Sequence, residues 1–376
     1  MIDFQKLPSP CFVLDEQLLD RNLAVIDRVR RESGAEVFVA LKACAMWSIF
    51  PELAQHSDGA TASSLAEARL VFEEFGRPAH TYAPVYTDRN IEEILDCSDH
   101  ITFNSVAQFA RFGQMALLRG ISCGLRINPG YSPVETDLYN PCVPGSRLGI
   151  PAGELKELPA GVEGLHFHVL CESRPEHLRL ALDAVEKRFG RFLDRIKWLD
   201  MGGGPLMTHK DYDCDELIRI LQEFKAKYPN LRLILEPGSA FTWRTGYLVS
   251  TVEDIVENGG VRTAMLDVSF ACHMPDCLEM PYKPAILGAR DPEPGEKGWR
   301  MGGNSCLAGD YYGDWIFDRD LRVGDRIVFE DMIHYTMVKT TMFNGVAHPA
   351  IAIVRRDGAI EIIREFGYED FKSRMS

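Results

Sequence analysis

Two charged residues stand directly after short apolar runs and could carry chemistry. Lys42 follows the run at 37–41, and a lysine partly removed from water can lose its proton and form an imine. Glu236 follows the run at 231–235, where a carboxylate could pair with a protonated ring nitrogen. For a single lysine at a strand end, a side chain that simply leaves the sheet into solvent is the better explanation. Glu236 could instead be a salt-bridged residue of the barrel, so neither residue alone identifies a site.

His166 and His168 flank Phe167 at the end of another apolar run. Alternate residues of a strand share one face, so both imidazoles could point the same way. They could bind a metal, with Cys171 or Glu172 as further ligands. Alternatively, one histidine could lie against a planar cofactor while the other stays in the core. This segment alone slightly favours the metal.

A third run, at 197–200, is followed by three consecutive glycines. Gly202, Gly203 and Gly204 would leave backbone N–H groups free to approach an anion. The dinucleotide-binding fingerprint fails because Met207 stands where its third glycine should be. A phosphate loop and a plain glycine turn remain about equally good explanations.

Further candidates lie in the last third of the chain. Cys306 and Asp310 share a loop bounded by glycine, and such loops carry function more often than strands do. Tyr335 offers a phenol, although a packed aromatic side chain is the commoner role for a tyrosine in this setting.

The elements that must position these residues alternate between strand and helix. Eight short apolar runs, at 37–41, 59–62, 81–83, 101–103, 124–127, 164–168, 197–200 and 231–235, mostly alternate with helical stretches. This predicts an α/β fold with an eight-fold β/α, TIM-like barrel, whose functional groups lie at the carboxyl ends of the strands. Residues 247–268, 322–343 and 349–366 instead predict strands and turns. We therefore expect a barrel over 15–240 and a mainly β domain over 1–14 and 241–376.

The composition excludes some classes of partner and leaves others open. A net charge of −14 argues against nucleic acid and would suit a cationic substrate, although a solvated acidic surface is the default explanation. The ten cysteines form no Cys-x-x-Cys pair, and neither a signal peptide nor a transmembrane run is visible. We expect a cytoplasmic protein with reduced cysteines and no membrane partner.

Taken in order, these residues resemble the fold-type III pyridoxal-phosphate decarboxylases, the family of ornithine and diaminopimelate decarboxylases, with an alanine racemase-like fold. The resemblance implies that Lys42 holds pyridoxal 5′-phosphate as a Schiff base, that His168 stacks on its ring and that Glu236 pairs with the ring nitrogen. It implies no metal. The implied contacts to the cofactor phosphate are Gly202, Gly203, Gly204, Gly238 and Tyr335.

The resemblance also implies a homodimer with shared active sites, in which Cys306 reaches the neighbouring chain. Two positions depart from the family: Leu170-Cys171 replaces its Gly-Ser, and Ser239 replaces an arginine. These departures are similar to the carboxynorspermidine/carboxyspermidine decarboxylase branch, which makes norspermidine or spermidine. The implied substrate is then a carboxylated polyamine, and its cationic nitrogens would prefer carboxylates. The candidates for substrate contact are Ser239, Asp276 and Asp310.

Several alternatives stay open from the sequence. The chain could decarboxylate another basic amino acid, such as diaminopimelate or ornithine. It could be a metal-dependent hydrolase that uses His166 and His168, or a non-catalytic cofactor-binding homologue. Within the decarboxylase interpretation, either Cys306 or released Lys42 could return the proton to the product. The sequence does not rank the two polyamine substrates or identify what replaces the missing phosphate contacts.

Overall fold

The computed structural model describes residues 2–376, which form two compact units. One unit spans Asn22–Phe241, and the other joins the segment up to Arg21 with the segment from Thr242 onward. Each unit has its own sheet, so the two are described separately.

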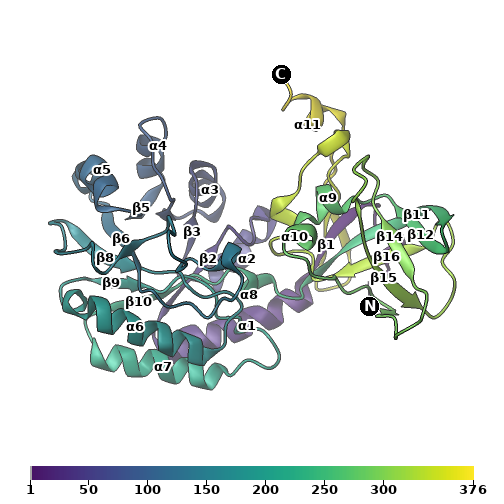
Figure 1. The fold of residues 1–376 in the computed structure, drawn as a ribbon. Helices are drawn as coiled ribbons and strands as arrows, with labels where there is room; N and C mark the ends of the chain where they lie inside the picture. The colour runs from purple at the N-terminus through teal and green to yellow at the C-terminus, as the bar shows by residue number, and fades with distance from the viewer. Residues whose placement is uncertain (1) are drawn as a thin grey trace. The chain divides into compact units, whose positions relative to one another are not determined.

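The first unit is a closed barrel of eight parallel strands (Figure 1). The strands follow one another around the barrel as β2-β3-β4-β5-β6-β8-β9-β10, and pairing of β10 with β2 and of β5 with β6 closes it. This confirms the predicted TIM-like barrel. The strands are β2 (Glu36–Ala40), β3 (Gly59–Ala62), β4 (Ala79–Tyr82), β5 (Ser98–Phe103), β6 (Ser122–Asn128), β8 (Val162–His166), β9 (Trp198–Asp200) and β10 (Arg232–Leu235), with the two-residue β7 (Ile150–Pro151) beside β6.

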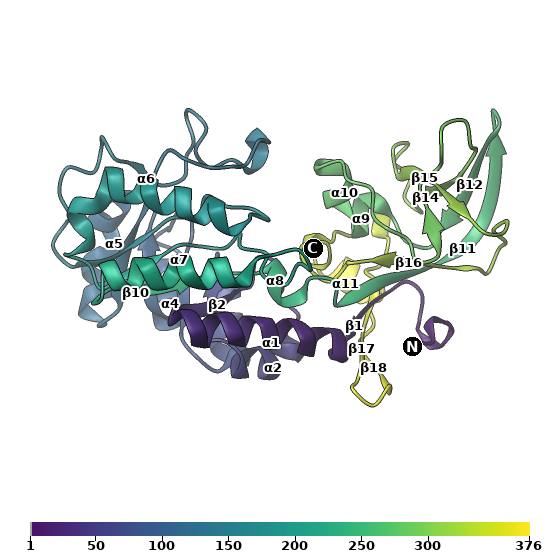
Figure 2. The same cartoon turned by 90° about the horizontal axis from the view of Figure 1, so that it is seen from below.

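Helices connect the strands and cover the outside of the barrel. Figure 2 shows α6 and α7 running side by side. Side-chain caps begin several of the helices: the hydroxyl of Ser105, for example, accepts the N–H of Gln108 at the start of α5. Within residues 2–376, no helix is both long and apolar enough to cross a bilayer. The helices are α1 (Glu16–Ser33), α2 (Phe50–Gln55), α3 (Leu65–Leu70), α4 (Ile91–Asp96), α5 (Val106–Leu118), α6 (Pro175–Leu193), α7 (Cys214–Lys227) and α8 (Ser239–Thr242).

A single tryptophan, Trp198, packs inside the barrel beside Phe38 and Ile234. Trp198 is buried, and its indole N–H donates to the hydroxyl of Ser122 at 2.9 Å. Two strands leave room for the ring by carrying glycine, because a Cβ atom at Gly124 or Gly164 would collide with it. One large side chain therefore occupies the space that two glycines, which have no side chain, leave inside the barrel.

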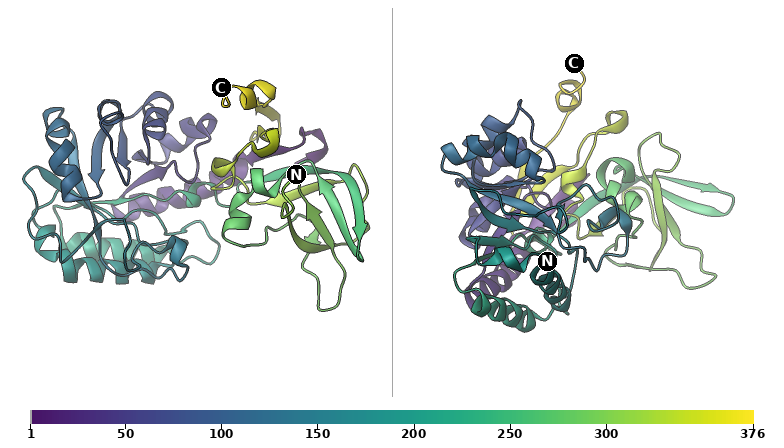
Figure 3. Two further views of the ribbon diagram at one scale, coloured as in Figure 1. Left: turned by 45° about the horizontal axis from the view of Figure 1, so that its top comes forward. Right: turned by 60° about the vertical axis from the view of Figure 1, so that its left-hand side comes forward.

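The second unit is built on a nine-stranded sheet in which the first strand of the chain lies between late ones. In Figure 3 the purple β1 runs beside the yellow β17, and the two are parallel. The path is β13-β15-β14-β12-β11-β1-β17-β18, with β16 paired to β11. The elements are β1 (Cys11–Asp15), β11 (Gly246–Asn258), β12 (Val261–Leu266), α9 (Phe270–His273), α10 (Pro275–Glu279), β13 (Ala289–Arg290), β14 (Trp299–Gly302), β15 (Tyr311–Phe317), β16 (Arg326–Glu330), β17 (Ala350–Val354), β18 (Ile360–Arg364) and α11 (Tyr368–Lys372).

Within 322–343, for which the sequence predicts strands and turns, Arg326–Glu330 form β16 and the other residues form no strand. The following segment contains three residues with left-handed backbone: Asp331 at φ 64°, Tyr335 at φ 50° and Asn344 at φ 56°. Such a backbone breaks a strand regardless of the β-forming residues around it. Strands β14 and β15 were not predicted, because short runs interrupted by Gly313 and charged residues carry little alternating pattern.

The packing around Trp198 makes a stability prediction. Gly164→Ala should lower the free energy of unfolding by about 1–3 kcal/mol, because the added methyl group overpacks the barrel. As the matched control, Gly190→Ala on α6 meets nothing within 4 Å and should raise it by about 0.5–1 kcal/mol. Urea denaturation measures both, and equal effects of the two variants would contradict the packing.

Candidate active site

Four neighbouring strands of the barrel bring the predicted cofactor residues to one place. Strands β2, β10, β9 and β8 are consecutive and parallel, so their carboxyl ends meet at the same edge. Lys42 follows β2, Glu236 follows β10, Gly202 follows β9 and His168 follows β8. Positions separated by as many as 194 residues of sequence thus converge at one mouth, where working groups of such barrels lie.

His168 contacts residues from two other strand ends. Its Nδ1 accepts the N–H of Gly203 at 2.9 Å, and its Nε2 lies 3.5 Å from Nζ of Lys42. Burial, together with the charges of Lys42 and Arg126, holds the pKa of His168 well below its usual value. The imidazole is therefore neutral, with its proton on Nε2 because Nδ1 is an acceptor.

The glycine turn packs closely against its neighbours. A Cβ atom at Gly202 would lie 2.6 Å from Nδ1 of His168, and one at Gly203 would lie 2.6 Å from the carbonyl oxygen of Glu236. A Cβ at Gly238 would meet that of Ala43 at 2.5 Å. Only residues without a side chain let the backbone approach these groups so closely.

Glu236 belongs to a buried polar cluster below the mouth. Nε2 of His166 lies 3.6 Å from Oε2 of Glu236, and Nε2 of His80 lies 3.6 Å from Oδ2 of Asp200. Burial alone would raise the pKa of Glu236, but His166, His80 and Asp200 together lower it to about 2. Burial and the neighbouring Glu236 raise the pKa of Asp200 well above its usual value. The two carboxyl groups therefore differ in protonation: Glu236 is ionised and Asp200 is neutral.

The sequence predictions missed three residues of this barrel interior: Asp200, His80 and Arg126. The guanidinium of Arg126 donates to the carbonyl of His168 at 3.1 Å and lies over the ring of Tyr82 at 4.7 Å. It thereby fixes the backbone that carries the histidine. For Arg126, the available signal in the sequence was a charged residue within an apolar run. It stands two positions after Gly124 and therefore on the same face of the strand.

The structure shows how the two departures from the family pattern are accommodated. Leu170 is buried against Gly204, where a Cβ atom would collide with it. The hydroxyl of Ser173 donates to the carbonyl of Cys171 at 2.9 Å and accepts its N–H at 3.1 Å. Ser239 begins the short helix α8, directly after Gly238. The loop after His168 is thus closed by its own hydrogen bonds.

Cys306, in the second unit, is exposed on a loop held by two side chains. Its N–H donates to Oδ1 of Asn344 at 2.9 Å. The two oxygens of Asp310 accept the N–H groups of Ala271 at 3.0 Å and Ser305 at 2.9 Å. A pocket of about 460 Å³ adjoins the cysteine. Asp310 therefore holds the loop, and its role as a substrate contact stays a prediction.

Asp276 and Tyr335 also lie in the second unit. Asp276 is buried, and its Oδ2 accepts hydroxyls from Tyr282 and Thr336, each at 2.9 Å. Within residues 2–376, Oδ1 of Asp276 has no hydrogen-bond partner. Tyr335 is partly buried on left-handed backbone, beside the ring of His334. A buried carboxylate oxygen that lacks a partner is costly unless a donor completes it.

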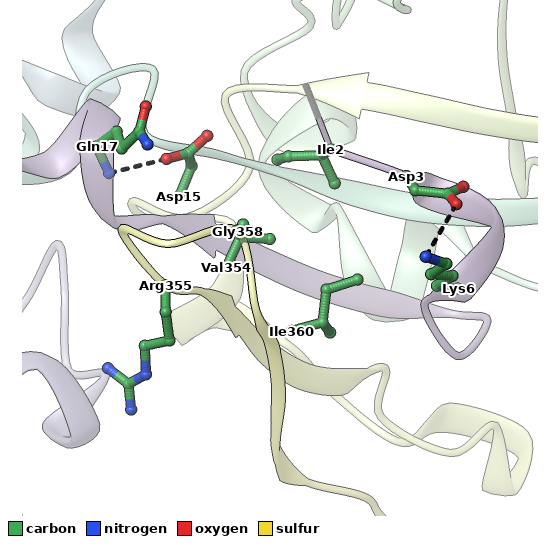
Figure 4. Close-up of a pocket in the computed structure, with 9 residues that line it drawn as sticks. All are labelled: Ile2, Asp3, Lys6, Asp15, Gln17, Val354, Arg355, Gly358 and Ile360. Carbon is green, nitrogen blue, oxygen red and sulfur yellow. Dashed lines mark hydrogen bonds and ion pairs between the residues drawn. The ribbon is translucent and has the colours of Figure 1, made fainter.

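A second pocket, of about 230 Å³, lies between β1, β17 and β18 (Figure 4). Asp3 and Lys6 form an ion pair at one side of it, and Asp15 accepts the N–H of Gln17 at another. It gathers none of the predicted site residues.

The residues whose geometry could suit a metal are not the pair His166 and His168 that the sequence suggested. Among the described residues, the one set of three whose possible ligand atoms all lie within 4.8 Å is His80, Asp200 and Glu236. His166 and His168 belong to no such group there. His80 and Asp200 are 1% and 0% exposed, so an ion would have to enter a closed core.

Comparisons with known proteins extend over nearly the whole chain. Residues 11–333 match the family described as "Pyridoxal-dependent decarboxylase, C-terminal sheet domain". The carboxyaminopropylagmatine decarboxylase of Synechocystis sp. is 54% identical, over 98% of this chain and 96% of its own. The carboxynorspermidine/carboxyspermidine decarboxylase of Campylobacter jejuni is 39% identical, over 99% of both.

A solved structure gives the same result in three dimensions. The crystal structure of Campylobacter jejuni carboxynorspermidine decarboxylase complexed with norspermidine superposes with a TM-score of 0.90, at 38% identity. The match covers 98% of this chain and 100% of that one. Sequence and fold therefore identify the same group of relatives.

The buried cluster makes a prediction for pH dependence. Burial lowers the pKa of His80 to about 3, so its imidazole should stay neutral from about pH 8 to about pH 5, whereas an ordinary histidine titrates near about 6.5. NMR spectra of the ring protons, assigned with His80→Gln, measure this. A titration midpoint near that of a free histidine would contradict the buried, uncharged state.

Proposed function

The chain belongs to the pyridoxal-dependent decarboxylases, and from that premise we propose that it decarboxylates a carboxylated aminopropyl polyamine with pyridoxal 5′-phosphate. The resemblance inferred from the residues is thereby confirmed. The observation that carries the proposal is full-length identity of 39–54% to decarboxylases named for such substrates. Diaminopimelate decarboxylases are more distant, at 23–25%.

The residues at the barrel mouth suit this cofactor. It needs an amine, a flat neutral surface, a carboxylate and donors for a phosphate. Lys42, His168, Glu236 and the close-packed turn at Gly202–Gly204 supply these groups from adjacent strands. His168 fits best because a neutral ring can lie against an aromatic system without charge repulsion.

When bound, pyridoxal phosphate supplies an electron sink for the bond that releases carbon dioxide. In the proposed mechanism, Lys42 holds the cofactor and yields its place to the substrate amine. Glu236, ionised in its buried position, keeps the ring nitrogen protonated. Because the N–H groups of Gly202 and Gly203 donate to Asp200 and His168, the proposed contact of this turn with the phosphate is Gly204, assisted by Gly238 and Tyr335.

The proton returned to the product would come from Cys306 or Lys42. Cys306 lies exposed on its loop, and Asn344 and Asp310 hold that loop in place. We propose that Cys306 completes the site of a second chain in a homodimer. An exposed thiol in a fixed loop suits this role, because a donor supplied by a neighbour must protrude from its own unit.

The far end of the substrate distinguishes two candidates. Carboxynorspermidine and carboxyspermidine end in an amine, which is a point charge. Carboxyaminopropylagmatine ends in a planar guanidinium, and the 54% identical relative favours this second candidate. Asp276 is the proposed partner, because its Oδ1 is buried and unpartnered among the described residues. Ser239, and Asp310 through its remaining acceptor positions, are weaker candidates.

The first prediction concerns the cofactor. Lys42→Ala should lower kcat/KM by more than about a hundredfold and remove the visible absorbance of the bound cofactor, because its covalent anchor is lost. Lys197→Ala, which removes an exposed lysine paired with Glu163, is the matched control and should change neither. A Lys42→Ala chain that retains both the absorbance and the activity would contradict the assignment.

The second prediction concerns the homodimer. Lys42→Ala and Cys306→Ala chains should each be impaired alone, but a mixed dimer would contain one site with both native residues. Equal mixing gives half mixed dimers, so activity should recover to about a quarter of the native value. Subunit exchange is verified by mass spectrometry of labelled chains. Full exchange without recovery would mean that each chain works alone.

The third prediction concerns the substrate. Carboxyaminopropylagmatine, carboxynorspermidine and carboxyspermidine should be decarboxylated with higher kcat/KM than ornithine, lysine or diaminopimelate. Asp276→Asn should reduce kcat/KM for the preferred polyamine by about thirtyfold or more, since loss of a buried charge partner costs about 2–5 kcal/mol.

Asp320→Asn, an exposed acid paired with Arg262, is the control for this variant and should leave kcat/KM unchanged. Rapid turnover of diaminopimelate, with all three polyamines untouched, would contradict the proposed substrate class. The ranking among the three polyamines decides between the amine and the guanidinium.

A further inference from the structure

Asp200 occupies the centre of the barrel behind Glu236, and the mechanism above assigns it no task. We propose that Asp200 is held as the neutral acid and donates its proton to the Glu236 carboxylate, which makes it a positioning residue for that carboxylate. The inference deepens the proposed function and rests on Glu236 facing the cofactor. It concerns only residues of the barrel unit.

The hydrogen bonds of Asp200 point to one protonated oxygen. Its Oδ1 accepts the N–H of Gly202 at 2.8 Å, as a carbonyl oxygen would. Its Oδ2 is fully buried and, among residues 2–376, has no donor directed at it. An acceptor without a donor in a closed core is rare and costly. If Oδ2 instead carries a proton, it becomes a donor and the deficit disappears.

Glu236 is the neighbouring carboxyl group, and its side-chain hydrogen bond with Asp200 is one cause of the pKa shift of each. Its carboxylate and that of Asp200 belong to the group whose atoms lie within 4.8 Å of one another. Two carboxylates this close, removed from water, do not both ionise, because each charge opposes the other. One proton between them removes the repulsion and adds a charge-assisted hydrogen bond.

The surroundings decide which of the two keeps the proton. Asp200 is 0% exposed, and the ring that faces its Oδ2 at 3.6 Å is the neutral His80 of β4. Glu236 is 12% exposed by side chain and faces His166 of β8 at 3.6 Å. Both distances exceed an ordinary hydrogen bond, so neither histidine replaces the carboxyl proton.

The other charged and titratable groups around the pair fit the same assignment. His166, His80 and Asp200 lower the pKa of Glu236 to about 2, whereas burial and Glu236 raise that of Asp200. The groups contributed by the surrounding strands are Arg126 of β6, which lowers the pKa of Asp200 and lies over Tyr82 of β4, Lys42 after β2, and His100 of β5, which stacks on His80.

For function, the consequence is that the pair carries a single negative charge, held in a fixed position on Glu236. With Asp200 neutral, one negative charge rather than two lies behind the cofactor ring, and the donated hydrogen bond fixes the rotamer of Glu236. The proton does not move in the reaction. Asp200 thus acts through Glu236 and needs no contact with the substrate.

The first test compares an amide with a methyl group. In Asp200→Asn the amide still donates to Glu236 and its oxygen still accepts from Gly202, so kcat/KM and cofactor affinity should stay within a few-fold of native. Asp200→Ala removes the donor and should lower both by about tenfold to a hundredfold, the scale of a charge-assisted hydrogen bond. Equal loss in the two variants would show that the charge of Asp200, and not its proton, is required.

The second test uses the protein without cofactor and without turnover. A carboxyl group that keeps its proton only in the folded state contributes less to folding stability as the pH rises above the pKa that it has in the unfolded chain. That pKa is about 3.9 for aspartate. The folding equilibrium constant of the native chain relative to Asp200→Asn should therefore fall between about pH 5 and pH 8, by up to about tenfold per pH unit.

Other titratable groups should not change this pH-dependent difference in stability between the native and Asp200→Asn chains. Glu236 is ionised in both the folded and unfolded states above about pH 5, and the buried histidines contribute equally to both chains. Asp58→Asn, which removes a half-exposed carboxylate paired with Arg30 in the same unit, is the control and should give a flat difference. A flat difference for Asp200→Asn as well would overturn the proposal.

The two tests separate this proposal from the proposed function. If the native enzyme turned over no polyamine but the pH-dependent stability difference were present, the substrate assignment would fail and the shared proton would stand. If elemental analysis found about one metal ion per chain that Asp200→Ala lost, the group would be a ligand set and the shared proton would be excluded.

Discussion

The barrel unit depends on one buried negative charge, the carboxylate of Glu236. An ionised carboxylate this deep is stable only when neighbouring groups compensate it, because isolated charges are costly away from water. Here His166, His80 and Asp200 surround it and lower its pKa to about 2. The other three groups remain neutral, so that the cluster concentrates its charge at the mouth and not in the core.

This polar layer explains the choice of small and large residues nearby. Trp198 closes the interior below the cluster and requires glycine at 124 and 164. Above it, the backbone at Gly202 and Gly203 must approach His168 and Glu236 within distances that exclude any side chain. Packing and electrostatics thus constrain the residue types of the same short segments. This is why glycine, histidine and acidic residues follow one another closely at the strand ends.

Much of the barrel followed from the sequence because its signals are local. Eight apolar runs of strand length mostly alternate with helices; Lys42 and Glu236 each follow such a run, and His168 ends one. Asp200, His80 and Arg126 were missed because the inward face of a strand is visible only once its register with its neighbours is known. In the second unit, left-handed backbone at Asp331 and Tyr335 ends a segment whose residues otherwise favour a strand.

The most direct measurement of the central claim is the site of cofactor attachment. The purified holoenzyme would be reduced with borohydride, digested and analysed by mass spectrometry, with the unreduced protein as the control. The account predicts one modified peptide per chain, with the reduced cofactor on Nζ of Lys42. Modification at a different lysine, or no covalent cofactor in a protein that still decarboxylates its substrate, would contradict it.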